Sequence, residues 1–201
     1  MSASTVLARL APEHAAPLLA FELANREWFR TLVPDRGDAY FRDFAGRHAA
    51  LLAEQRAGTS LFWLVLDGAG DIVGRVNLVD LAAGGATLGY RIGAAHTRRG
   101  HARRAVAEVV RRAARLGLTH LLASTTVDNT GSQKVLAGAG FRPVPGLPPS
   151  LPVGDGERPA LHFRRDLTPA DAGPGPQVED PVQATSQVRA AASHQRGRLR
   201  G

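Results

Sequence analysis

The chain contains no cysteine, which excludes disulfide bonds, thiolate zinc sites and a cysteine nucleophile. No apolar run approaches the roughly 18–20 residues needed to cross a bilayer. The first residues, Met1-Ser2-Ala3-Ser4, lack the basic segment followed by an apolar one that marks a secretion signal. No His-Glu-x-x-His or similar metal-binding spacing occurs. These absences predict a cytoplasmic protein with neither a membrane association nor a metal.

Lysine is also scarce, since Lys134 is the only one, yet the net charge is +7 because arginine is abundant. Two explanations remain open: a functional basic surface, or GC-rich coding that favours arginine, alanine, glycine and proline. The 201 residues suffice for one well-buried domain and a tail. We predict one domain over 1–167. The Pro-, Gly-, Gln- and Ala-rich composition of 168–201 predicts a disordered tail.

Hydrophobic periodicity predicts a mixture of helices and strands. Helical spacing follows Pro12 and recurs over 38–56, 100–117 and 129–139. Runs typical of strands cover 5–11, 59–66, 72–78, 86–92, 121–127, 141–144 and 160–164. The second to fourth of these are joined by short turns, which predicts a three-stranded antiparallel meander. A strand, a helix and a strand then follow from 86 to 127, which predicts a parallel pair with a right-handed crossover.

The turn before the third helix reads Thr97-Arg98-Arg99-Gly100-His101-Ala102. A helix that begins at such a turn presents free backbone N–H groups to a phosphate. Gly100 would let the backbone approach the ligand closely. We expect the amides from Arg99 to Arg103 to converge on a diphosphate, with charge-assisted contacts from Arg98, Arg99 and Arg103.

Three residues further along extend this predicted site. An amide-bearing ligand arm can lie along the backbone near Ile92 if the parallel strands diverge there. Asn129 would bind that arm through its side-chain amide, and the same residue is a good N-cap for the short helix that follows. Ser132 could donate a hydrogen bond near the end of the arm, or be an ordinary polar residue of the first helical turn.

Together these residues resemble the GNAT superfamily of acetyl-CoA-dependent N-acetyltransferases, and more narrowly the RimJ/RimL type that acetylates ribosomal-protein N-termini. The resemblance covers 3–167. It implies an α/β (α+β) fold with a mixed six- or seven-stranded twisted sheet and helices on both faces. It also identifies the diphosphate as that of coenzyme A and the arm as pantetheine. The motifs that carry it are Asn25-Arg26, Ile72-Val73-Gly74-Arg75-Val76, Leu88-Gly89-Tyr90, the Gly100 turn, Asn129-Thr130-Gly131-Ser132 and Gly140-Phe141.

The sequence departs from the family pattern at two positions. Thr97 stands where the family turn usually opens with Gln or Arg, and Thr87 stands where a Glu often precedes the turn. If that Glu acts as a base in relatives, this protein must do without it. Asp80 is an alternative base acting through water, although a turn residue is the duller explanation for it. An N-terminal α-amine, with a pKa near ~8, needs little help at neutral pH.

For the chemistry, we expect a backbone N–H near Ile92 to polarise the thioester carbonyl. Ser132 is the candidate that protonates or hydrogen-bonds the departing thiolate. Tyr90 and Trp63 are expected in the core, while Trp28 and Phe29 either line an acceptor groove or pack in the core.

Three functions remain open for this sequence. The first is acetylation of a protein N-terminus, the second is acetylation of a small-molecule amine, and the third is a basic module that binds RNA or the ribosome without catalysis. A monomer and a homodimer are both compatible with it.

Overall fold

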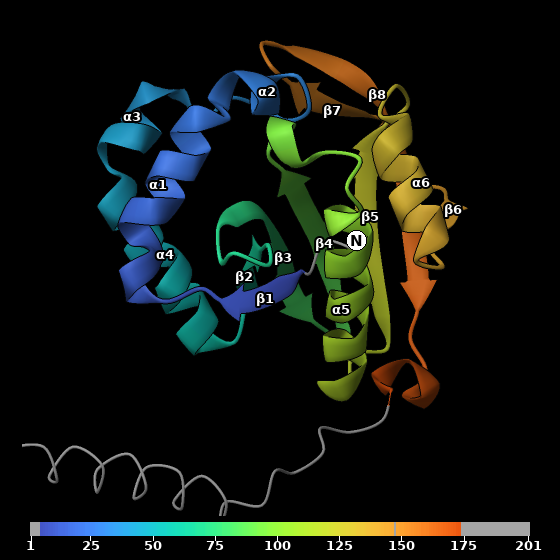
Figure 1. The fold of residues 1–201 in the computed structure, drawn as a ribbon. Coiled ribbons are helices and arrows are strands. Elements are labelled where there is room, and N and C mark those ends of the chain that lie inside the picture. Colours follow the sequence, from blue (N-terminus) through green and yellow to red (C-terminus); the bar gives the residue numbers. More distant parts are fainter. Residues whose placement is uncertain (1–4, 147, 174–201) are drawn as a thin grey trace, which may run out of the picture.

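The computed structural model describes residues 5–146 and 148–173. Its centre is an eight-stranded sheet with the order β1-β2-β3-β4-β5-β8-β6, in which β7 pairs with β8 (Figure 1). Every pair is antiparallel except β4 with β5. The strands are β1 Val6–Arg9, β2 Leu61–Leu66, β3 Ile72–Ala82, β4 Gly85–Ile92, β5 His120–Thr126, β6 Arg142–Val144, β7 Ser150–Val153 and β8 Gly156–Asp166.

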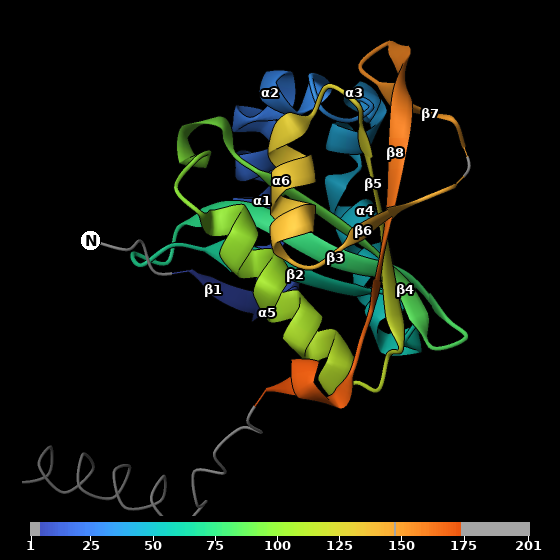
Figure 2. The same ribbon diagram turned by 90° about the vertical axis from the view of Figure 1, so that its right-hand side faces the viewer.

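Helices cover both faces of the sheet. The long helix α5 and the short helix α6 lie on one face, and the helices α1 to α4 lie on the other (Figures 1 and 2). Their bounds are α1 Ala15–Ala24, α2 Arg26–Arg30, α3 Gly37–Arg42, α4 Phe44–Ala57, α5 His101–Arg115 and α6 Thr130–Gly138. Three 3-10 turns complete the described elements: η1 Pro12–His14, η2 Ala94–His96 and η3 Pro169–Ala172.

Two apolar clusters fix these layers. Helix α5 is amphipathic, and its apolar stripe is buried against the sheet, as the 3.6-residue period predicts. The members of that stripe are Ala105, Val106, Val109, Val110 and Ala113. The second cluster joins Leu18, Phe21, Phe29 and Phe44 of the opposite helices to Phe62 and Leu64 of β2. Strand β2 is therefore buried on both faces, as its continuous apolar run predicts.

The parallel strands β4 and β5 pair only near their beginnings. Their register runs from Gly85–His120 to Thr87–Leu122, although both strands continue beyond it. They separate over the remaining residues, and this opens the sheet between Leu88–Ile92 and Ala123–Thr126. The divergence that the sequence analysis required is confirmed, and it positions the site described below.

The fold class, the meander and the parallel pair are confirmed, but several details were wrong. Strand β1 adds a fourth antiparallel strand to the meander. The predicted helix 38–56 is divided at Asp43, which is both the C-cap position of α3 and the N-cap position of α4 and whose carboxylate lies next to Gly46. The expected loop 145–156 contains β7, which forms a hairpin with β8 and brings the strand count to eight rather than six or seven.

The predicted start of the tail at Thr168 was also wrong. Residues 168–173 include the turn η3, which contacts α5. Asp171 accepts hydrogen bonds from the Thr168 amide at 2.8 Å and pairs with Arg165 of β8, and Arg115 of α5 donates to the Ala172 carbonyl at 3.0 Å. The remainder of the predicted tail, 174–201, lies outside the described residues. Among the described residues, no helix is long and apolar enough to span a membrane.

Candidate active site

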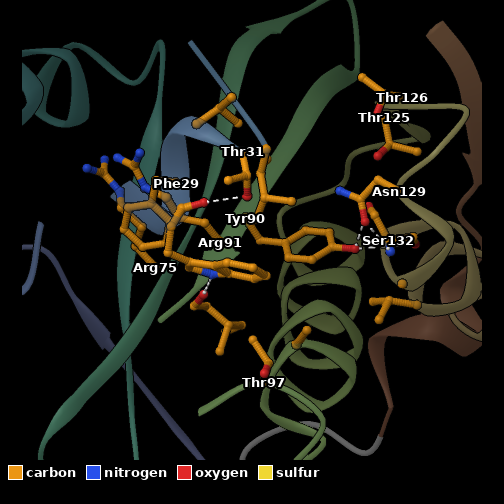
Figure 3. A pocket seen from close by; sticks show the side chains of 18 of the residues that line it. Phe29, Thr31, Arg75, Tyr90, Arg91, Thr97, Thr125, Thr126, Asn129 and Ser132 are labelled. Atoms are coloured by element: carbon orange, nitrogen blue, oxygen red, sulfur yellow. Dashed lines mark hydrogen bonds between the residues drawn. The ribbon is translucent and has the colours of Figure 1, made fainter. Parts of the chain in front are cut away.

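A large cleft of about 1430 Å³ occupies the gap between β4 and β5. It extends from the N-terminal end of α5 to the side of the sheet where α2 and β7 lie. In the close-up, Phe29, Arg75 and Arg91 gather at one side of the cleft, and Asn129 and Ser132 lie at the other, with Tyr90 between them (Figure 3). Its volume exceeds the roughly 300–1,000 Å³ of a typical small-molecule site, so a coenzyme and a second substrate fit together.

The part of β4 that does not pair with β5 presents backbone N–H and C=O groups to the cleft. The Gly93 amide donates to the Val73 carbonyl of β3 at 2.9 Å. Because successive residues of a strand point their amides to opposite sides, the amides of Ile92 and Tyr90 face away from β3, toward the cleft. The Ile92 carbonyl also faces it, since the Trp28 indole N–H donates to this oxygen at 3.0 Å. The Ile92 amide thus faces the cleft, and its donation to a ligand stays a prediction.

The turn before α5 presents a row of backbone donors. Gly100 has a φ of 82°, and α5 begins directly after it at His101. The first intrahelical hydrogen bond joins the Arg104 amide to the Gly100 carbonyl at 3.1 Å, so the amides of 101–103 have no acceptor within the helix. Arg98 also adopts a left-handed φ of 57°, which is strained for a side-chain-bearing residue. Such turns form concave nests of N–H groups that bind anions.

Glycine at position 100 is also required for a reason that was not predicted. A Cβ at Gly100 would lie 2.9 Å from Nη1 of Arg104. The Arg104 side chain stabilises the turn, because its guanidinium donates to the Arg99 carbonyl at 2.7 Å and to the Thr5 hydroxyl at 2.8 Å. The glycine is therefore required by its positive φ and by the arginine beneath it. No pattern in the sequence indicated this contact of Arg104.

The predicted basic and polar groups divide into two sets. Arg98, Arg103 and the backbone of Ala102 line the cleft, together with Gly100 and His101. Arg99 does not line it, and only its carbonyl has a structural part, as the acceptor for Arg104. The His101 ring is buried and contacts the Thr5 hydroxyl at 3.0 Å, and burial lowers its pKa. Only the amide of His101 is available to a ligand.

On the opposite side of the cleft, the residue that caps α6 is also a lining residue of the cleft. The Asn129 side-chain oxygen accepts from the Ser132 amide at 3.0 Å, so Asn129 is the N-cap of α6. The Ser132 hydroxyl lies 2.9 Å from the Tyr90 hydroxyl (Figure 3). Burial raises the pKa of Tyr90, against the hydrogen bond with Ser132, so its hydroxyl stays protonated at neutral pH. Sequence analysis assigned Tyr90 to the core and missed this pair.

Asp80 does not belong to the cleft. It is exposed, has a φ of 55° and lies at the irregular end of β3, where the register shifts between Val79 and Ala82. The cleft adjoins the opposite end of this strand pair, where Gly74 faces Ile92. The assignment of Asp80 as a base acting through water was therefore wrong, and the turn explanation accounts for it.

A buried ionic cluster lies at the side of the cleft next to α2. Arg75 and Arg91, which face each other across β3 and β4, both donate to one carboxylate oxygen of Glu22, at 3.2 and 2.7 Å. The Arg91 guanidinium also lies over the Phe29 ring, 4.8 Å from its centroid. Trp28 and Phe29 line the cleft while Phe29 packs in the second apolar cluster, so the two sequence explanations for Phe29 both apply.

The family model described as "Acetyltransferase (GNAT) domain" matches residues 5–142, which include every lining residue of this cleft except Leu151 and Pro152. The chain belongs to the GNAT acetyltransferase family. Enzymes of this family transfer acetyl groups and use acetyl-CoA as co-substrate. The resemblance seen in the sequence is confirmed at the level of the family. No curated protein sequence matches the chain.

Solved structures share the fold at low sequence identity. The ribosomal-protein-S5-alanine acetyltransferase from Vibrio fischeri has 19% identity and a TM-score of 0.74, over 83% of this chain and 93% of that one. RimJ from Mycobacterium smegmatis, in complex with CoA-disulfide, has 24% identity and a TM-score of 0.73, over 81% of each chain. The spermidine N-acetyltransferase from Vibrio cholerae, in complex with CoA and spermine, has 15% identity and a TM-score of 0.66, over 81% and 95%.

The described residues fit the coenzyme of this family. The unpaired backbone groups of β4 can hydrogen-bond an amide-bearing pantetheine arm, and the nest of N–H groups at the start of α5 can bind a diphosphate. Among the residues that the structure describes, no group of three or more His, Asp or Glu side chains could hold a metal ion.

Two glycines at the two ends of this helix allow a matched test of the nest. Gly100 and Gly117 have φ values of 82° and 78°, and Gly117 lies outside the cleft with open space around its missing Cβ. Alanine in a left-handed conformation costs roughly 1–2 kcal/mol, so Gly100→Ala and Gly117→Ala should both lower the Tm. Only Gly100→Ala should also weaken acetyl-CoA binding, by about 10-fold in calorimetry, which corresponds to ~1.4 kcal/mol. Equal affinities in the two variants would contradict the assignment of the nest.

Proposed function

We propose that this protein transfers the acetyl group of acetyl-CoA directly to the α-amine of a protein or peptide N-terminus. The observation that carries the proposal is the gap between β4 and β5, which connects the nest at Gly100 with a separate basin beside α2 and β7. The coenzyme enters from the α5 side, and its acetyl end meets the acceptor within the gap.

In this proposal the nest holds the diphosphate. The amides of 100–103 donate to its oxygens, and Arg98 and Arg103 add charge-assisted contacts. The pantetheine arm extends along Tyr90 and Ile92 of β4, where β5 has diverged and no longer pairs with this strand. Asn129 already caps α6, and the described residues offer no acceptor to its side-chain N–H groups, which leaves these donors for the arm.

The chemical step requires a polarised carbonyl and a stabilised leaving group. The Ile92 amide donates to the thioester oxygen as negative charge develops on it. The neutral amine attacks the carbonyl carbon, its nitrogen releases a proton to solvent, the C–S bond breaks and the thiolate leaves to be protonated by solvent. The Tyr90 hydroxyl lies 2.9 Å from the Ser132 hydroxyl. In this proposal Tyr90 is the donor of that pair, which leaves the Ser132 proton free to hydrogen-bond the thiolate sulfur. An α-amine, with a reference pKa near ~8, supplies enough neutral nucleophile without a dedicated base.

A small-molecule amine is the second candidate acceptor, since the spermidine N-acetyltransferase shares the fold. A polyamine is a poor match to this cleft. The carboxylates among its described lining residues are Asp35 and Asp128, and each is already paired with an arginine, Arg26 or Arg158. A peptide N-terminus carries one amine and needs no such partners, which favours it.

A panel of acceptors tests the proposal. With acetyl-CoA present, we expect a rise in Tm that follows RT ln(1 + [L]/Kd), and release of coenzyme A when peptides with free α-amines are added. Spermidine, aminoglycosides and free amino acids should react more slowly. A protein that binds RNA in a salt-sensitive manner and shows neither the Tm rise nor thiol release would be a binding module, contrary to the proposal.

A further inference from the structure

We call the part of the cleft beside α2 and β7 the acceptor basin. The buried side chains beneath it carry one more positive charge than negative charge. Arg75 and Arg91 lie on the face of the sheet covered by α1 and α2, and their side chains are only 6% and 11% exposed. Both form ion pairs with Glu22, whose side chain is 2% exposed. Two guanidiniums and one carboxylate leave an excess of +1 in a place from which water is largely excluded.

The guanidinium N–H groups are only partly satisfied. One Glu22 oxygen accepts from Nη1 of Arg75 and from Nη2 of Arg91, and the described residues offer no other hydrogen-bond partner to either guanidinium. Burial lowers the pKa of Arg91 to about 9, against the attraction of Glu22, and the charges of Arg75 and Arg36 act in the same direction as burial. An additional anion would relieve this imbalance.

The excess charge lies next to the reacting centre. Arg91 immediately precedes Ile92, whose amide faces the thioester in the proposed function. Both arginines line the cleft, as do Phe29 and the exposed Arg36 at its rim. Figure 3 shows Arg75 and Arg91 beside Phe29, across the cleft from Asn129 and Ser132. An acceptor with its amine at the thioester would therefore place its adjoining groups near these arginines.

We infer that Arg36, Arg75 and Arg91 form a subsite for a carboxylate of the acceptor, supplied by an acidic side chain close to the acetylated N-terminus. The inference rests on the acetyl transfer proposed above and adds a sequence preference to it. Guanidinium groups bind carboxylates through paired, charge-assisted hydrogen bonds, and such contacts gain strength when partly desolvated.

Three synthetic peptides of equal length, beginning Ala-Asp-Asp, Ala-Asn-Asn and Ala-Lys-Lys, test the subsite. We expect kcat/KM for the acidic peptide to exceed that for the neutral one by about 10-fold or more, because hydrogen bonds to charged groups are the strong ones. The lysine peptide should be the slowest. The preference should shrink in 0.5 M salt, where the Debye length falls to about 4 Å.

Two variants locate the preference. Arg91→Met leaves Arg75 and Glu22 as a balanced pair, so the fold should persist, and the acidic preference should be lost. Arg36→Gln, at an exposed position, should reduce it about 3-fold, as expected for a partly screened charge. Arg47→Gln on α4, outside the cleft and 59% exposed, is the matched control and should change nothing. The Tm shift with acetyl-CoA verifies that each variant is folded.

The outcomes separate the two proposals. Acetylation at equal rates for all three peptides, or fastest for the lysine peptide, would overturn the subsite while the acetyl transfer stands. An acidic preference that survives in Arg91→Met would also overturn it. Failure of every peptide to release coenzyme A would overturn the proposed function, and the subsite with it.

Discussion

Glu22→Leu should destabilise the protein by about 3–5 kcal/mol, since removing one partner of a buried ionic cluster leaves the others without compensation. Glu22 neutralises Arg75 and Arg91 at the contact between α1 and the sheet, and the substitution leaves two buried positive charges facing each other. For a chain of this size the loss corresponds to a Tm lower by roughly 6–20 °C. Urea denaturation monitored by circular dichroism measures it.

Glu27→Leu is the control for this experiment. Glu27 lies on the neighbouring helix α2, pairs with Arg30 at 3.4 Å and is 83% exposed, so its replacement should change the stability by less than ~0.5 kcal/mol. Similar losses in the two variants would mean that the cluster is no more important than a surface ion pair. That result would also weaken the case for a charge imbalance under the acceptor basin.

Ser132→Ala should lower kcat by about 10–100-fold and change the Kd for acetyl-CoA by less than ~3-fold. A hydrogen bond to a charged group contributes about 1.5–3 kcal/mol, and in the proposed reaction the sulfur becomes charged only as the thiolate leaves. The contribution therefore falls on the transition state rather than on the bound coenzyme. Steady-state kinetics and calorimetry on the same preparation separate the two effects.

Tyr90→Phe provides the second arm of that experiment. If Tyr90 acts only by orienting Ser132, its loss should cost less than the loss of Ser132, and the double variant should be no slower than Ser132→Ala alone. Ser150→Ala removes a hydroxyl from β7 outside the cleft and serves as the control. Unchanged turnover in Ser132→Ala would remove Ser132 from the mechanism.

The sequence predicted the fold well where local periodicity and tertiary structure agree. Helix α5 has a continuous apolar stripe, and β2 is an uninterrupted apolar run, so both were found within a few residues. The errors fell where the outcome depends on one backbone turn or on pairing between strands. One helical pattern is interrupted at Asp43 and forms two helices. Strand β7 exists because Ser150–Val153 pairs with β8, which no local pattern in a Pro- and Gly-rich segment indicates.

The location of the cleft was predictable only where a motif lies in one stretch of chain. The Gly100 turn, Asn129 and Ser132 all line the cleft, and their roles stay predictions. Groups joined across the sheet were missed: Tyr90 meets Ser132 from another element, and Glu22 meets its two arginines across long sequence separations. The sequence placed Asp80 in the mechanism because it ends a meander strand, but which end of that strand faces the cleft depends on the three-dimensional register.

A crystal structure with acetyl-CoA tests the central claim most directly. We expect the diphosphate on the amides of 100–103, the pantetheine arm between β4 and β5, and the thioester oxygen within hydrogen-bond distance of the Ile92 amide. A coenzyme bound elsewhere, or an arm that does not enter the gap between these two strands, would contradict it.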